Sequence, residues 1–180
     1  VNPALTARAI LMTSWVGYMS GSAYQVAVRG VDAISAATPL AAPESYELWQ
    51  LFIGQCPGCI GEVGRVAILV GGVYLIARKV ISWRVPVLML STLFVCTWLA
   101  EGSACDGLYA ILSGGAFLAA FFMATDYATS PVTPVGKLIM GVGCGLITFV
   151  IRRFSSMAEG ASYAVLIMNL TVPLIDRYTR

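Results

Sequence analysis

Long apolar stretches that are almost free of charge constrain the fold of this chain more than any other feature. Five of them reach or approach the roughly 20 residues that a helix needs to cross a bilayer core, and a sixth is weaker. The chain is 58% hydrophobic and 11% charged, against roughly 25% charged residues in soluble domains. A soluble fold of this length hides only about 70% of its unfolded surface, so lipid must cover much of the rest. The six stretches cover about residues 4–23, 64–77, 85–100, 107–125, 135–151 and 161–175.

We therefore predict an all-α integral membrane protein, a bundle of five to six transmembrane helices with one long loop. Residues 1–23 hold the first span, residues 24–63 the loop, and residues 64–180 the rest of the bundle. The stretch at 64–77 is short, and we expect Val80 and Ile81 to extend its helix past two basic residues that snorkel.

The loop at 24–63 contains Pro39, Pro43 and Pro57, so a regular helix through it is not expected. Unpaired backbone is costly in hydrocarbon, and the loop must lie in water or against protein. A structureless segment of this length in a compact chain is usually functional or disordered. The run from Trp49 to Ile53 is typical of a piece that docks on the membrane surface.

Basic residues in the connections predict the orientation. If the loop at 24–63 is extracytoplasmic, seven basic residues lie on the cytoplasmic side and four outside, which agrees with the positive-inside rule. The inner group is Arg8, Arg78, Lys79, Arg84, Lys137, Arg177 and Arg180, and the outer group is Arg29, Arg65, Arg152 and Arg153. The pair Arg152-Arg153 opposes the rule, and we interpret it as a solvated helix end or as a contact for an acidic partner or a phosphate.

Several site classes are disfavoured by composition. The chain has no histidine, which removes the commonest general base and the commonest metal ligand. A net charge of +2 does not indicate nucleic-acid binding. The five cysteines are an odd number and predict no disulfide framework; Cys56 and Cys59 form a Cys-x-x-Cys that is read as two reduced thiols or as a redox pair. No signal peptide is visible, and the missing initial Met indicates a trimmed or partial chain.

Small residues recur at helical spacing. Gly141, Gly145 and Thr148 share one face of their stretch, and Gly17 and Gly21 repeat the spacing. Such faces let two helix backbones approach closely in lipid, so they predict tight packing in the bundle or between subunits.

Six blocks of sequence, taken in order, resemble a known family. They are Asn2-Pro3-Ala4-Leu5-Thr6-Ala7-Arg8-Ala9, the segment that ends in Thr38, Gly58-Cys59-Ile60-Gly61-Glu62, Ile81-Ser82-Trp83-Arg84-Val85-Pro86, the run from Ala124 to Pro134, and the late pieces Ile151-Arg152-Arg153-Phe154, Glu159-Gly160 and Met168-Asn169. Together they resemble the D subunit of the Rnf electron-transport complex and, more distantly, the B subunit of the sodium-pumping NADH:quinone oxidoreductase. The resemblance spans nearly the whole chain but only the C-terminal half of the family's usual length.

The resemblance implies a covalent flavin. In that family, FMN is esterified through its phosphate to the last threonine of a Ser-Gly-Ala-Thr motif. The matching positions here are Ser35, Ala36, Ala37 and Thr38, with Asp32 before them. Ala36 stands where the family has glycine, and if a flavin transferase requires φ > 0 there, alanine carries a conformational penalty. The alternative is that Thr38 is an ordinary turn or capping threonine followed by a proline.

A second flavin is a further expectation from the resemblance. Related proteins hold a non-covalent riboflavin in the membrane domain, and we expect such a site near the inner end of the helices. Asp126, Thr129 and Ser130 are the candidate residues, for a flavin or for an ion. The alternative for Asp126 is a water-exposed helix end.

The function that the resemblance implies is electron transfer within an ion-translocating ferredoxin:NAD⁺ oxidoreductase in the bacterial inner membrane. The expected partners are the other subunits of an Rnf-type complex, a flavin transferase that matures the protein, and membrane lipid. Two alternatives remain, a B-type subunit of a sodium-translocating NADH:quinone oxidoreductase and a transporter or scaffold subunit without redox chemistry.

Overall fold

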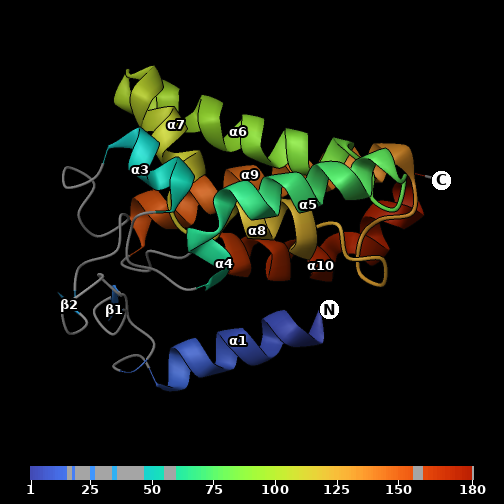
Figure 1. The fold of residues 1–180 in the computed structure, drawn as a ribbon. Helices are drawn as coiled ribbons and strands as arrows, with labels where there is room; N and C mark the ends of the chain where they lie inside the picture. The colour runs from blue at the N-terminus through green and yellow to red at the C-terminus, as the bar shows by residue number, and fades with distance from the viewer. Residues whose placement is uncertain are drawn as a thin grey trace.

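The computed structural model describes residues 1–15, 18, 25–26, 34–35, 47–54, 60–155 and 160–179. The regular secondary structure of the described part is helical apart from one pair of two-residue strands (Figure 1). The all-α prediction is therefore confirmed. The elements are α1 (Pro3–Ser14), β1 (Gln25–Val26), β2 (Ile34–Ser35), α3 (Leu48–Ile53), α4 (Ile60–Val63), α5 (Arg65–Ala77), α6 (Arg84–Glu101), α7 (Ala104–Leu112), α8 (Ala116–Leu118), the π-helix η3 (Ala119–Met123), α9 (Pro134–Phe154) and α10 (Gly160–Tyr178).

Helix α9 forms the centre of the bundle, with α6 on one side and α10 on the other. The small-residue face predicted from the sequence lies against α6. A Cβ atom added at Gly141 would lie 3.0 Å from the carbonyl oxygen of Val85, and one added at Gly145 would lie 2.7 Å from that of Met89. The two backbones are thus in direct contact, and the prediction of tight helix packing is confirmed at this face. Gly17 and Gly21 lie outside the described residues.

The ends of the bundle are distinct in Figure 1. The start of α1, the turn between α5 and α6 and the end of α10 lie at one end. Helices α3 and α7, the strand pair and the turn between α6 and α7 lie at the opposite end. Arg78 and Lys79 belong to the turn between α5 and α6 and Arg177 to the end of α10, so three of the seven basic residues predicted to be cytoplasmic belong to elements at this end.

Two described helices, α6 and α9, are long and apolar enough to cross a membrane. A third crossing is added if α7 and the segment Ala116–Met123 are counted as one span. Among the described residues, α1, α5 and α10 do not meet both the length and the hydropathy requirement. The helical architecture is therefore as predicted, while the described helices support two or three spans by this criterion.

The predicted span at 107–125 is not one continuous helix. The chain breaks after Leu112, and the two helical pieces meet at an angle of 71°. The run Ser113-Gly114-Gly115 makes the break, and Gly114 adopts a φ of +64°, which favours glycine. Broken helices at membrane depth are tolerated where protein satisfies their free backbone groups.

The predicted extension of α5 through Val80 and Ile81 is wrong. Lys79 adopts a φ of +58° and ends the helix. Its N–H donates to the carbonyl of Ile76 at 2.9 Å, and the N–H of Val80 donates to that of Leu75 at 3.0 Å. This is the hydrogen-bond pattern of a Schellman cap, which satisfies the last carbonyls of the helix and turns the chain away.

The loop at 24–63 carries more regular structure than predicted. It contains the strand pair, in which Gln25 is opposite Ser35, and the two short helices α3 and α4. Helix α3 begins with a reciprocal capping box between Glu47 and Gln50, a local signal strong enough to start a helix between two prolines. Its Leu51 is fully buried while Trp49 is 68% exposed, so α3 packs one side on the bundle and exposes its tryptophan.

Candidate functional site

The motif that resembles the flavin-attachment sequence begins where β2 ends. The backbone of Ser35 is extended and pairs with that of Gln25. Asp32, Ala36, Ala37 and Thr38 lie outside the described residues. The proposed acceptor threonine therefore follows the strand pair by three residues, and its role stays a prediction.

The second candidate site, around Asp126, joins two distant parts of the chain. Oδ2 of Asp126 accepts a hydrogen bond from Nδ2 of Asn2 at 3.2 Å and another from Oγ1 of Thr129 at 3.1 Å. Oδ1 of Asn2 in turn accepts from the N–H of Ala4 at 3.0 Å and caps α1. The polar groups predicted to bind a ligand are thus brought together, and one carboxylate oxygen of Asp126 is already engaged in fixing the start of α1.

The rest of the connection between η3 and α9 is held in the same way. The N–H of Ser130 donates to the carbonyl of Asp126 at 3.0 Å, which closes a turn. The N–H of Val132 donates to Oδ1 of Asp176 on α10 at 3.2 Å. Thr133 caps α9 and shares a hydrogen bond of 2.6 Å with Thr179. This connection is therefore fixed to both α1 and α10.

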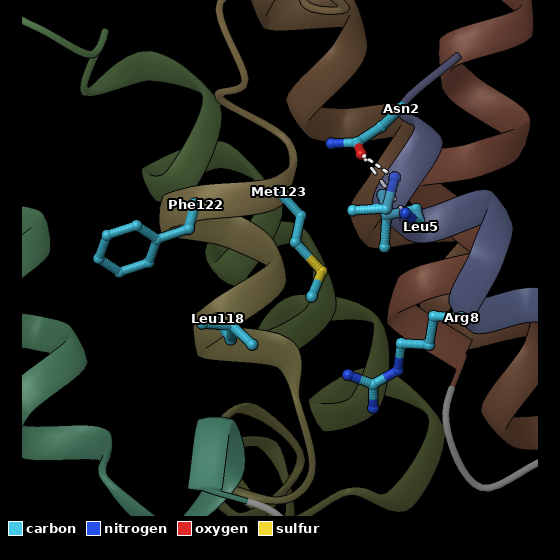
Figure 2. Close-up of a pocket in the computed structure, with 7 residues that line it drawn as sticks. Asn2, Leu5, Arg8, Leu118, Phe122 and Met123 are labelled. Carbon is cyan, nitrogen blue, oxygen red and sulfur yellow. Dashed lines mark hydrogen bonds between the residues drawn. The ribbon is translucent and has the colours of Figure 1, made fainter.

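A pocket of about 390 Å³ lies next to this cluster, between α1 and the segment Ala116–Met123 (Figure 2). Asn2 and Arg8 are its polar residues, and the side chain of Arg8 reaches from α1 into the space between the helices. The apolar walls are Ala4, Leu5, Leu118, Phe122 and Met123.

The size and lining of the pocket suit an organic ligand with an apolar body. Binding sites for small molecules typically have volumes of about 300–1,000 Å³, with apolar walls and a few polar groups that fix orientation. Met123 provides a flexible, polarisable thioether that adapts to aromatic rings. Arg8 supplies a donor that does not lose its charge. Asn2 links this pocket to Asp126, so the two features form one candidate site at this end of α1.

The basic pair at the end of α9 has structural partners. Nη1 of Arg152 donates to the carbonyl of Ala110 at 2.6 Å, and its Nη2 donates to that of Ser113 at 3.1 Å. Both carbonyls lie at the end of α7. Because the helix breaks there, no backbone N–H of a following turn donates to them. Arg153 forms an exposed ion pair with Glu101. Arg152 therefore serves packing between α9 and α7, whereas Arg153 lies exposed at the helix end and pairs with Glu101.

A similar arginine lies at the start of α5. Arg65 is only 2% exposed and donates from Nη1 to the carbonyl of Leu51 in α3.

Cys56 and Cys59 lie outside the described residues, so their pairing is not tested. In the part of the chain that the structure describes, no three acidic, cysteine or histidine side chains come together to form a metal site.

Comparison with known proteins decides the family. The model of the family described as NQR2, RnfD, RnfE matches residues 1–180. The chain belongs to this family. The resemblance inferred from the six sequence blocks is therefore confirmed over the whole chain.

Relatives in the family are similar throughout. The chain is 45% identical to the D subunit of the Na⁺-translocating ferredoxin:NAD⁺ oxidoreductase complex of Acetobacterium woodii, over 100% of this chain and 57% of that protein. It is 36% identical to the D subunit of the proton-translocating ferredoxin:NAD⁺ oxidoreductase complex of Clostridium ljungdahlii, over 99% of this chain and 59% of that protein. It is 35% identical to the D subunit of the ion-translocating oxidoreductase complex of Halorhodospira halophila, over 99% of this chain and 61% of that protein. The chain thus spans less than two thirds of the length of these relatives.

Sequence reasoning missed the pocket and the helix-capping arginines. Arg8 is a charged residue inside an apolar stretch, which is a signal for a polar site. Arg8 is counted only among the basic residues that predict the orientation, and so is not identified from the sequence as part of a polar site. The pairing of Asn2 with Asp126 joins residues 124 positions apart, and no local pattern predicts such a contact.

Proposed function

We propose that this chain is the flavin-bearing part of the D subunit of an Rnf-type, ion-translocating ferredoxin:NAD⁺ oxidoreductase. The observation that carries the proposal is similarity from end to end with the D subunits of such complexes, at up to 45% identity. These relatives are named as parts of complexes, so the proposed partners are the other subunits of such an assembly. The coupling ion is left open, because the names of two relatives specify different ions, Na⁺ and the proton.

In this proposal the redox group is FMN esterified to Thr38. A tethered flavin is held at high local concentration and does not diffuse away between turnovers. The flavin supplies the redox chemistry, and the protein supplies position and electrostatics. The position of Ser35 supports the proposal, because this first residue of the motif ends a strand at the end of the molecule opposite the chain termini.

The pocket beside Arg8 is the proposed place for a second, non-covalent flavin. Its apolar walls would contact an aromatic ring system, and Arg8 and Asn2 would donate hydrogen bonds to ring carbonyls. Asp126 would hold the side chain of Asn2 in place, and Thr129 would hold Asp126. Ser130 would contribute by closing the turn through its N–H. Replacement of Met123 by Trp, which fills the pocket, is expected to remove extractable flavin and to leave covalent flavin in place.

The test of the covalent flavin uses the full-length protein produced together with its flavin transferase. Intact-mass measurement should show an FMN-sized adduct, and the denatured band should fluoresce under ultraviolet light. Thr38→Ala should abolish both signals, whereas Thr13→Ala, the same change at an exposed position of α1 outside the motif, should retain them. An adduct that survives Thr38→Ala, or no adduct in the unaltered protein, rejects the assignment.

A quinone-reducing sodium pump is the second candidate, because the matching family model includes the NQR2 proteins as well. The flavin chemistry would be the same and the acceptor different. Reduction of NAD⁺ by ferredoxin in the purified complex favours the Rnf-type role, and reduction of quinone by NADH favours the other. A colourless, flavin-free complex instead indicates a transporter or scaffold role.

We further infer a bacterial inner-membrane location with five to six crossings and with Thr38 on the extracytoplasmic side. The basic residues at the end of the bundle that holds the termini support this orientation. Lipid is therefore the environment of the exposed apolar faces of α5 and α9.

A further inference from the structure

Asn169 of α10 is a buried polar residue that neither the flavin chemistry nor the helix caps use. It is only 5% exposed. Neither its Oδ1 nor its Nδ2 has a hydrogen-bond partner among the described residues. Amide groups buried away from water are almost always hydrogen-bonded, because leaving them without partners is costly. An occupant that supplies those bonds is therefore expected.

A second and independent feature lies at the same turn of the helix. Pro173 is inside α10, four residues after Asn169. Proline has no N–H, so the backbone carbonyl of Asn169 lacks its usual helical donor. The neighbouring hydroxyl does not replace that donor, because Oγ1 of Thr171 donates to the carbonyl of Met168 at 2.8 Å. One residue thus presents a side-chain amide and a backbone carbonyl that both need partners.

The surroundings of this turn are apolar. Val165 and Val172 lie one turn before and after Asn169 on the helix, and both belong to the hydrophobic core or pack against it. The elements that pack most closely on α10 are α9, α1 and η3. No aspartate or glutamate occurs in any of these three elements.

The carboxylate of α10 itself, Asp176, lies two turns beyond Asn169 and accepts a hydrogen bond from the N–H of Val132. The lack of a carboxylate in the three neighbouring elements therefore argues against a charged occupant. A cation removed from water into an apolar interior is strongly unfavourable unless nearby negative charge compensates it. The amide also presents a donor, Nδ2, which repels a cation but binds the oxygen of a neutral molecule. A single water can donate to the two carbonyl oxygens or accept from Nδ2, and it needs only a very small space.

We propose that Asn169 and its own backbone carbonyl, at the proline-interrupted turn of α10, bind an ordered water molecule inside the helix bundle. The water bridges the side chain and the main chain and thereby stabilises the turn that Pro173 leaves open. This proposal is independent of the flavin assignments, because none of its residues belongs to the motif or to the pocket.

The direct test is a cryo-EM map of the full-length protein in its assembled complex, at a resolution that shows ordered water. We expect a density peak about 2.7–3.2 Å from both the amide and the main-chain oxygen of Asn169. If instead a protein group from another subunit, or from the remainder of a longer chain, bonds to the amide, the proposal is overturned. A map that shows the turn clearly without such a peak overturns it as well.

Three variants of the complex in nanodiscs give an independent test by thermal unfolding. Asn169→Leu removes one anchor of the water and leaves the carbonyl without a partner, so the midpoint should fall by roughly 3–6 °C. Pro173→Ala restores the helical donor, so the double variant Asn169→Leu/Pro173→Ala should recover most of that loss. A rise in midpoint for Asn169→Leu alone would mean that the site is dry, since replacing an unsatisfied buried amide by an apolar group is stabilising.

Sodium titration separates water from a cation. For a neutral occupant, the unfolding midpoint of the unaltered complex and of Asn169→Leu should respond equally to Na⁺ and to K⁺ at constant ionic strength. A Na⁺-specific rise that Asn169→Leu abolishes would show that a cation binds at this turn, and it would overturn the water assignment.

Discussion

Two adjacent arginines at the end of α9 have different energetic roles. Arg152 donates to the carbonyls of Ala110 and Ser113 and is partly buried, whereas Arg153 is half exposed and pairs with Glu101. Arg152→Gln should lower the free energy of unfolding by about 1–3 kcal/mol, because the carbonyl of Ser113 loses the donor Nη2 and that of Ala110 keeps only a long hydrogen bond of 3.5 Å from Oγ of Ser113. The matched change Arg153→Gln should cost less than about 1 kcal/mol, as is usual for exposed ion pairs. Unfolding of each variant in mixed micelles measures the difference, and equal losses would contradict these roles.

The flavin motif departs from the family pattern at Ala36, and this difference has a kinetic consequence. If the transferase binds the motif with φ > 0 at this position, alanine resists that conformation and glycine does not. Ala36→Gly should then increase the initial rate of FMN attachment to Thr38 by roughly tenfold, which corresponds to a conformational penalty of about 1–2 kcal/mol. In-gel flavin fluorescence over time measures the rate. An unchanged rate would show that the transferase does not use a left-handed conformation there.

At the scale of single residues, the sequence singles out candidate residues but does not predict their contacts. Thr38 and Asp126 stand out by their place in blocks that resemble the family, and that family is confirmed. The contact of Asp126 with Asn2 depends on how α1 folds back against α10, which no local pattern encodes. The position of Arg152 in the sequence predicts only a helix end or a surface contact, because its partners lie at the break in a neighbouring helix.

Helix α9 makes a prediction at the scale of the element, because two of its glycines differ in what they contact. A Cβ atom at Gly145 would lie 2.7 Å from the backbone oxygen of Met89, which cannot move without shifting α6. At Gly143 the nearest atoms belong to the flexible end of Met168. Gly145→Ala should therefore destabilise the protein by about 1–3 kcal/mol through overpacking. Gly143→Ala should be neutral or stabilising, since alanine gains about 1 kcal/mol in helix propensity. Thermal unfolding of the two variants measures the difference. A similar loss of stability in both would mean that the contact of Gly145 with the backbone of α6 does not limit what this position accepts.

The elements that the sequence predicts well are those in which local pattern and tertiary packing agree. Helices α6 and α9 follow their apolar stretches to within a few residues at each end, and Pro134 with the cap at Thr133 fixes the start of α9. The break inside the predicted span at 107–125 is not visible in the sequence pattern, because hydropathy is continuous across it. The run Ser113-Gly114-Gly115 is a turn signal that the apolar flanks conceal. The predicted end of α5 fails because a Schellman cap forms on a lysine, a residue that seldom adopts φ > 0.

At the scale of the whole molecule, the arrangement of the bundle predicts which connections share a side of the membrane. The turn between α5 and α6 and the turn between α6 and α7 lie at opposite ends, because α6 is one of the helices long enough to cross. Cys105, at the start of α7, is exposed at the end proposed to be extracytoplasmic, and Lys79 is exposed at the other. A membrane-impermeant maleimide should therefore distinguish these two positions in intact cells.

The experiment uses two variants of the full-length protein that each carry one reactive thiol in this part of the chain. The first keeps Cys105 and replaces Cys56, Cys59, Cys96 and Cys144 by alanine, and the second also carries Cys105→Ala and Lys79→Cys. Intact cells should label the first variant and leave the second unlabelled, while permeabilised cells should label both. Because Thr38 follows a strand pair at the same end as Cys105, labelling of the second variant alone would place the flavin motif in the cytoplasm. That result would contradict both the positive-inside assignment and an extracytoplasmic flavin.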